Sequence, residues 1–131
     1  MKFLPTKVHG VLDYLVGIAL VAAPTLFGFR DVGGPAVIIP TVIGIVLIAY
    51  SFFTDYEWGV VKKISMGYHL LVDYVASAFL ALSPLLFGFA DQGLNVWLPH
   101  TVVGLTVIAV VLVSQPGISI PGKKGYAPAA R

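Results

Sequence analysis

The chain has 131 residues, of which 58% are hydrophobic and 11% are charged. Soluble domains usually carry about 25% charged residues, and a chain this short cannot bury so much apolar surface in its own core. This composition therefore excludes an ordinary soluble enzyme and a disordered tail. It also excludes a nucleic-acid binder, because the net charge of +2 does not come from a basic face. The absence of cysteine also excludes disulfides and thiolate metal sites.

Four apolar segments are each long enough to cross a bilayer, for which about 20 helical residues suffice. They cover residues 8–29, 35–53, 64–89 and 96–113. Helices are favoured over strands, because a helix satisfies its own backbone hydrogen bonds in lipid and these runs lack the alternation of a membrane barrel. The connections are short, so neighbouring helices should run antiparallel.

The N-terminal segment has features of a signal peptide, with Lys2 at its start and small residues at 21–23. Asp13 interrupts the apolar run, and a similar segment recurs inside the chain. We therefore expect residues 8–29 to be retained as a membrane helix and not cleaved.

The basic residues predict the orientation in the membrane. Seven of the eight lie at the two termini or in the middle connection: Lys2, Lys7, Lys62, Lys63, Lys123, Lys124 and Arg131. Arg30 is the one basic residue on the other side. The positive-inside rule then predicts a multi-pass protein of the inner (cytoplasmic) membrane with both termini in the cytoplasm.

The two halves of the chain are copies of one unit. With a shift of 60 residues, residues 9–54 and 69–114 share 16 identities over 46 positions. Each unit has two helices, so both enter the membrane in the same direction, which predicts parallel repeats related by a pseudo-two-fold axis along the membrane normal. The expected fold is an all-α membrane protein of four transmembrane helices. Its parts are residues 1–60 and 61–115, the two repeats, and 116–131, a poorly ordered cytoplasmic tail.

A helix-end and turn motif recurs near the end of the first helix of each unit. It contains Pro24 and Gly28 in the first unit, and Pro84 and Gly88 in the second. Proline removes a backbone donor, so it should bend or terminate the helix. Glycine suits the tight turn that follows.

Around these prolines the sequence resembles a known family. The second unit reads Ser83-Pro84-Leu85 and the first reads Ala23-Pro24-Thr25, each within a two-helix unit that is used twice. This arrangement resembles the SPW-repeat membrane proteins, with leucine or threonine where the family has tryptophan. The resemblance covers residues 8–114 and implies a small bacterial integral membrane protein, with no reaction attached.

The second repeated feature is polar and lies inside the first helix of each unit. Asp is costly in a spanning helix, and each Asp follows a His by four residues, a spacing that places both on one helix face. A Tyr follows each Asp. The candidate intramembrane cluster is His9, Asp13, Tyr14, His69, Asp73 and Tyr74. If the units pack about a two-fold axis, the two His–Asp pairs could meet.

Three interpretations of these pairs compete. The preferred one is a structural clamp that fixes the packing of the two repeats, since polar groups commonly join helices in membranes. The second is a proton or ion path, for which His beside an acid is a usual part. The third, metal or haem binding through His9 and His69, is disfavoured because the sequence lacks the ligand spacing of a zinc site.

We therefore expect a structural or interaction role for the chain. The alternative is a proton-coupled or ion-conducting protein, which would require an oligomer around a shared path. The expected partners are the lipid bilayer and, through self-association, further copies of the chain. No enzymatic activity, metal or cofactor is expected, because no nucleophile–base or phosphate-binding motif is present. His100 should be a solvated residue at the membrane interface, since Pro40 takes its place in the first unit.

Overall fold

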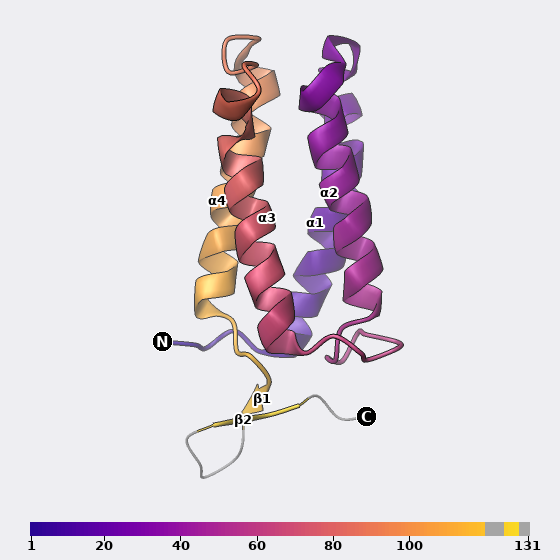
Figure 1. Ribbon diagram of the computed structural model, residues 1–131, viewed down its shortest axis with the longest axis vertical. Helices are drawn as coiled ribbons and strands as arrows, with labels where there is room; N and C mark the ends of the chain where they lie inside the picture. Colours follow the sequence, from indigo (N-terminus) through magenta and orange to yellow (C-terminus); the bar gives the residue numbers. More distant parts are fainter. Residues whose placement is uncertain (120–124, 129–131) are drawn as a thin grey trace.

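The structure is a computed structural model that describes residues 1–119 and 125–128 and consists mainly of four long helices (Figure 1). The elements in chain order are α1 (Thr6–Leu26), the short 3-10 helix η1 (Arg30–Val32), α2 (Gly34–Phe52), α3 (Met66–Leu86), α4 (Leu94–Val113), β1 (Ile118–Ser119) and β2 (Tyr126–Ala127). All four α-helices are long and apolar enough to cross a membrane. This confirms the predicted all-α membrane fold.

The first helix of each half ends at a glycine turn, a little earlier than the hydrophobic run predicts. α1 ends at Leu26, and Gly28 follows with a φ of 68°. The amide of Phe29 then donates to the carbonyl oxygen of Pro24 at 2.9 Å, which is the Schellman arrangement of a helix C-terminus. Gly88 has the same geometry at the end of α3, with a φ of 69°. Pro24 lies within the helix, so glycine and not proline determines where it ends.

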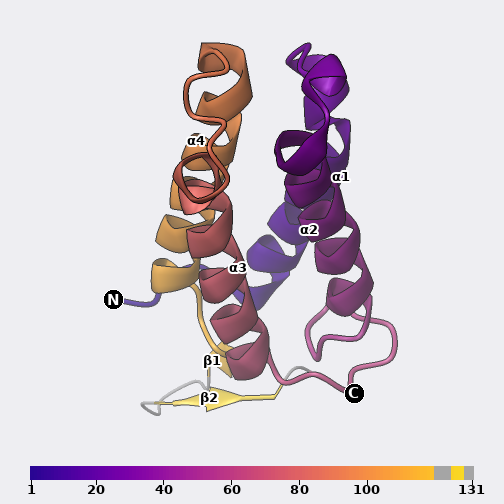
Figure 2. The same cartoon turned by 45° about the horizontal axis from the view of Figure 1, so that its top comes forward.

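The helices are paired within each half of the chain. α1 packs along α2, and α3 packs along α4, and the two pairs stand side by side in both views (Figures 1 and 2). The backbones approach closely at Gly44 and Gly104: a Cβ atom at Gly44 would lie 2.6 Å from the carbonyl oxygen of Gly17, and one at Gly104 would lie 2.6 Å from that of Ser77. Small residues permit such close packing in membranes.

The bundle has two distinct ends (Figure 1). We call the one formed by residues 1–5, 53–65 and 114–119 the basic end, and the one formed by residues 27–33 and 87–93 the turn end. Backbone bridges pair Leu4 with Ser114 and Thr54 with Ile64 at the basic end. These two bridges are related by the 60-residue shift, as the duplication predicts.

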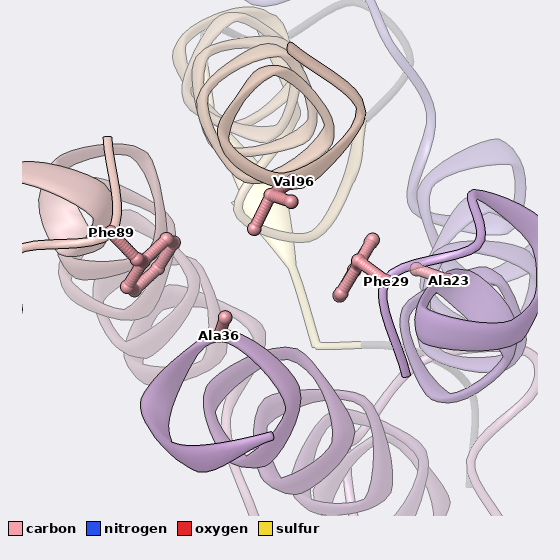
Figure 3. Close-up of a cluster of buried hydrophobic side chains, with 5 residues drawn as sticks. All are labelled: Ala23, Phe29, Ala36, Phe89 and Val96. Carbon is pink, nitrogen blue, oxygen red and sulfur yellow. The ribbon is translucent and has the colours of Figure 1, made fainter. Parts of the chain in front are cut away.

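Buried apolar side chains gather at both ends. Phe29, Ala36, Phe89, Val96 and Ala23 form a cluster at the turn end (Figure 3). At the basic end, a second cluster contains Tyr56, Met66, Leu70 and Val111. The two helix pairs contact each other less than the two helices within each pair do. Each cluster contains residues of both halves and so contributes to the join between them.

The tail contains more structure than the sequence suggests. β1 and β2 pair as antiparallel strands, with Ile118 opposite Ala127 and Ser119 opposite Tyr126. The expectation of a poorly ordered tail over 116–131 falls partly on residues 120–124 and 129–131, which lie outside the described residues.

Candidate functional site

The two His–Asp pairs lie on the first turns of α1 and α3 and are buried. Within α1, His9 Nε2 lies 3.1 Å from Asp13 Oδ1. Within α3, His69 Nε2 lies 3.1 Å from Asp73 Oδ2. The four-residue spacing therefore gives direct contact on each helix, as it predicts. None of the four side chains has more than 7% of its surface exposed.

The pairs also contact each other across the two repeats. His9 Nε2 lies 3.0 Å from Asp73 Oδ2, and His69 Nε2 lies 3.1 Å from Asp13 Oδ2. The imidazole rings meet edge to face, with their centroids 5.5 Å apart. Each histidine thus touches the acid of its own helix and the acid of the other repeat. We call these four residues the His–Asp cluster.

Two hydroxyl groups lie within hydrogen-bond distance of the Nδ1 atoms of the histidines. Ser114 Oγ lies 2.7 Å from His9 Nδ1, and Thr54 Oγ1 lies 2.6 Å from His69 Nδ1. Each hydroxyl also lies close to a backbone carbonyl oxygen of its own helix turn, Val110 at 2.6 Å and Tyr50 at 2.8 Å.

These contacts indicate which nitrogen of each histidine carries a hydrogen. A hydroxyl has one proton, and the backbone carbonyl oxygen can only accept it. With that proton donated to the carbonyl oxygen, the hydroxyl oxygen is free to accept from Nδ1–H of His9 or His69, which favours this tautomer. Both rings consequently direct Nε2 at the two carboxylates, with Nδ1–H anchored on the protein.

The connection between the repeats covers the cluster at the basic end. Tyr56 is fully buried, and its hydroxyl donates to Asp13 Oδ2 at 3.0 Å. Burial, and next the charge of Asp13, raise the pKa of the Tyr56 phenol, so it remains a hydrogen-bond donor. A Cβ atom at Gly10 would lie 2.7 Å from the Tyr56 ring, so α1 fits this connection only through a glycine.

Further polar contacts fix the same connection to α1. Thr6 Oγ1 donates its hydrogen to the carboxylate of Glu57, whose two oxygens lie 2.8 and 3.0 Å away. The indole nitrogen of Trp58 donates to the carbonyl oxygen of Lys7 at 2.9 Å. Tyr14 donates to the carbonyl oxygen of Trp58 at 3.0 Å. The connection between the repeats is therefore fixed to α1 by several hydrogen bonds and covers the cluster.

The structure separates the predicted residues into three groups. His9, Asp13, His69 and Asp73 come together in one site, whereas Tyr14 binds the covering connection and Tyr74 is 45% exposed on the helix surface. Of the helix-end and turn residues, Gly28 and Gly88 lie at the turn end, and Pro24 and Pro84 lie in the last turns of α1 and α3 next to it, away from the cluster.

Sequence reasoning missed Thr54, Ser114 and Tyr56. A signal for the first two was present, because Thr54 and Ser114 are 60 residues apart and both carry a hydroxyl group. Tyr56 has Pro116 at the shifted position, so the repeat gives it no counterpart.

The expectation for His100 was wrong. Its side chain is 1% exposed, and it lies between the halves at the turn end. Its Nε2 is 2.9 Å from the carbonyl oxygen of Ala36 on α2, and its Nδ1 is 2.7 Å from that of Val96 on α4. Phe29 and Phe89 contact its ring, with centroids 5.5 and 4.9 Å away. The ring is therefore a second polar contact between the repeats.

The match with a family model covers residues 7–114 and is to the SPW repeat domain. The chain belongs to the SPW-repeat family. The matched range includes α2, α3 and α4, all of α1 except its first residue, and the whole His–Asp cluster. A comparison with curated proteins found no match, and a comparison with solved structures found none either.

The residues that carry the SPW resemblance lie at the turn end. Ser83 is fully buried and donates to the carbonyl oxygen of Leu80 at 2.7 Å. Its counterpart Ala23 packs in the apolar cluster beside Phe29 (Figure 3). In this SPW-repeat protein the motif thus belongs to helix packing, and the ionisable cluster lies at the opposite end of the bundle.

Proposed function

We propose that this multi-pass membrane protein has a structural or interaction role, in which the His–Asp cluster clamps the two repeats together. The observation that carries the proposal is the crossed pairing: His9 contacts Asp73, and His69 contacts Asp13. A pair within one helix would stabilise that helix alone. A crossed pair joins helices that have few other contacts between them.

The surroundings of the cluster support a clamp. Ser114 and Thr54 orient the histidines, and Tyr56 donates to Asp13. A buried charged pair is stable only when its remaining hydrogen-bonding atoms also find partners. The contacts at the basic end provide such partners and limit the number of ways in which the repeats can pack.

Exposed apolar side chains on the helices support the bilayer as the partner. They occur on α1, α2 and α3 alike, for example at Leu15, Ile18, Ile45, Leu71 and Val75. A soluble protein does not usually expose apolar surface of this extent. Self-association into a homo-oligomer stays a prediction, and the clamp does not require it.

We also propose the orientation that the basic residues indicate, with the basic end in the cytoplasm and the membrane being the inner one. A cysteine introduced at Lys62 should then be protected from a membrane-impermeant maleimide in intact cells, and one at Asp91 should be labelled. The reverse pattern would contradict this orientation.

The alternative function is proton or ion conduction. The cavity beside the cluster does not favour it, because the lining of this cavity is mainly apolar. This cavity of about 130 Å³ lies between the repeats and is bordered by Asp73. Its lining includes Leu20, Leu47 and Leu80. An ion that left the cluster in this direction would lose polar contacts.

The clamp is tested by replacing both carboxylates, Asp13→Asn with Asp73→Asn. The variant removes the charged pairs at nearly constant volume, so we expect the free energy of unfolding to fall by at least about 2 kcal/mol. Thermal unfolding in detergent measures this change. The matched control is Asp31→Asn with Asp91→Asn, which changes two exposed acids and should have little effect.

Reconstitution in liposomes distinguishes the clamp from the alternative. The clamp predicts no proton or cation flux for the wild type. Flux in the wild type that disappears in a folded Asp13→Asn, Asp73→Asn variant would replace the clamp by conduction. Equal stability of this variant and the wild type would also contradict the clamp.

A further inference from the structure

We propose that the His–Asp cluster is a binding site for one divalent first-row transition-metal ion, with zinc as the representative ion. The ligands are Nε2 of His9 and His69 and one carboxylate oxygen each of Asp13 and Asp73. These atoms all lie within 4.8 Å of one another. The donors come from positions 60 residues apart, which is why no ligand spacing is visible in the sequence.

The distances fit a tetrahedral ion. The four nitrogen–oxygen contacts in the cluster measure 3.0 to 3.1 Å. Asp73 contacts both histidines through Oδ2, whereas Asp13 contacts His9 through Oδ1 and His69 through Oδ2. Ligands that surround zinc at about 2.0 Å in a tetrahedron are separated by about 3.3 Å. Side-chain rotations that turn one Asp13 oxygen toward both histidines, and that bring ligand atoms now up to 4.8 Å apart closer together, would admit an ion.

The chemistry of the donors also fits. Imidazole nitrogen suits zinc, nickel, copper and iron, and carboxylate oxygen is a common additional ligand of zinc. Two carboxylates carry two negative charges, which one divalent ion balances in this buried place. The mixed nitrogen and oxygen set is therefore more suitable for a transition-metal ion than for calcium or magnesium, which prefer oxygen alone.

The hydroxyl groups of Ser114 and Thr54 provide a hydrogen-bond acceptor for the histidine nitrogen that does not bind the metal. Such a histidine usually donates its second N–H to an acceptor on the protein, which fixes the tautomer and the ring orientation. His9 donates through Nδ1 to Ser114, and His69 donates through Nδ1 to Thr54. Each Nε2 thus faces the centre of the cluster.

An independent observation concerns His69. Its side chain is fully buried, yet its Nε2 has no hydrogen bond of adequate geometry among the described residues. The atom lies 3.1 Å from a carboxylate oxygen of Asp13 and 3.1 Å from one of Asp73, so a hydrogen on it would point directly at neither. Buried polar atoms are rarely left this way, whereas a metal ion between the three groups would satisfy all of them.

This inference shares its residues with the proposed clamp, and a bound ion would strengthen that clamp. The two proposals can fail separately, however. The clamp is tested by the unfolding stability of the metal-free protein with and without the two carboxylates. The metal site is tested by metal binding to the wild type.

Cobalt(II) is the appropriate probe, because a tetrahedral cobalt site absorbs visible light strongly and an octahedral one weakly. The full-length protein is purified in detergent, treated with a chelator and, after removal of any histidine tag, titrated with cobalt. We expect one ion per chain with the tetrahedral spectrum, and zinc should displace it.

Variants show whether the cluster is the site. His69→Gln should abolish the tetrahedral spectrum, and Thr54→Val should keep it with about 10–100-fold weaker binding, since it removes the partner of a ligand. His100→Gln is the matched control, because His100 is also buried but lies at the other end, against Phe29 and Phe89. This variant should bind cobalt like the wild type.

The wild-type titration does not depend on the folding of any variant. Absence of a tetrahedral spectrum in the folded wild type at micromolar cobalt would overturn the metal site. A spectrum that survives in folded His69→Gln would overturn it as well. If metal-free Asp13→Asn, Asp73→Asn is destabilised and the wild type binds no metal, the clamp stands and the metal site does not.

Discussion

At the scale of single residues, the repeat produces a site that neither copy contains alone. Asp13 accepts contacts from His9 of its own helix and from His69 of the other repeat. Tyr56 then adds a hydrogen bond to the same carboxylate. Because these polar groups are buried together, a substitution that removes one of them leaves its partners without a hydrogen bond and should lower the stability of the protein.

Tyr56→Phe tests this dependence with the smallest change. The ring and its packing are retained, and the hydroxyl that donates to Asp13 is lost. We expect the free energy of unfolding to fall by about 1–2 kcal/mol, because the hydrogen bond is buried and made to a charged group. Thermal unfolding measures it, with Tyr74→Phe as the control, since Tyr74 is 45% exposed. An equal loss in both variants would count against a specific role of the hydroxyl.

The sequence predicted the four residues of the cluster but not their hydroxyl partners. His9 and Asp13 are visible because they are polar in an apolar run, and the repeat points to His69 and Asp73. Thr54 and Ser114 lie at helix ends, where hydroxyl residues are common, so nothing local distinguishes them. His100 was wrongly expected in solvent, because its role depends on Ala36, which is 64 residues away.

At the scale of elements, the two helix pairs depend on close backbone contact. Gly44 on α2 faces Gly17 on α1, and Gly104 on α4 faces Ser77 on α3. These contacts recur with the 60-residue shift. The helices were predictable from hydropathy, but their exact ends were not, since the glycine turn removes three residues from the runs that end at Phe29 and Phe89.

Gly104→Ala tests the contact within the second pair. The added methyl group would lie 2.6 Å from the carbonyl oxygen of Ser77 and 2.7 Å from the Ala81 backbone. α3 and α4 would have to separate, so we expect a loss of about 1–3 kcal/mol in the free energy of unfolding. The matched control is Gly67→Ala, which meets no atom within 4 Å and should be neutral or stabilising. Similar unfolding temperatures for the two variants would contradict this account of the packing.

At the scale of the whole molecule, two helix pairs are joined at both ends by polar contacts. The His–Asp cluster joins them at the basic end, and His100 joins α4 to α2 at the turn end. Between these places lies the apolar cavity bordered by Leu20 and Leu80. The duplication was predictable from sequence. The pseudo-two-fold axis stays a prediction, which the recurring contacts at a 60-residue spacing support.

We propose that the His–Asp cluster holds the two repeats at a fixed distance. The chain has no cysteine, so spin labels can be attached at Val11→Cys on α1 and Leu71→Cys on α3, both exposed and next to the cluster. Double electron–electron resonance then measures the distance between the two spin labels, and so between the repeats, in lipid. With the cluster intact, we expect a single narrow distribution. With Asp13→Asn and Asp73→Asn added, the distribution should become broader or longer. An unchanged narrow distribution in the folded variant would contradict the clamp.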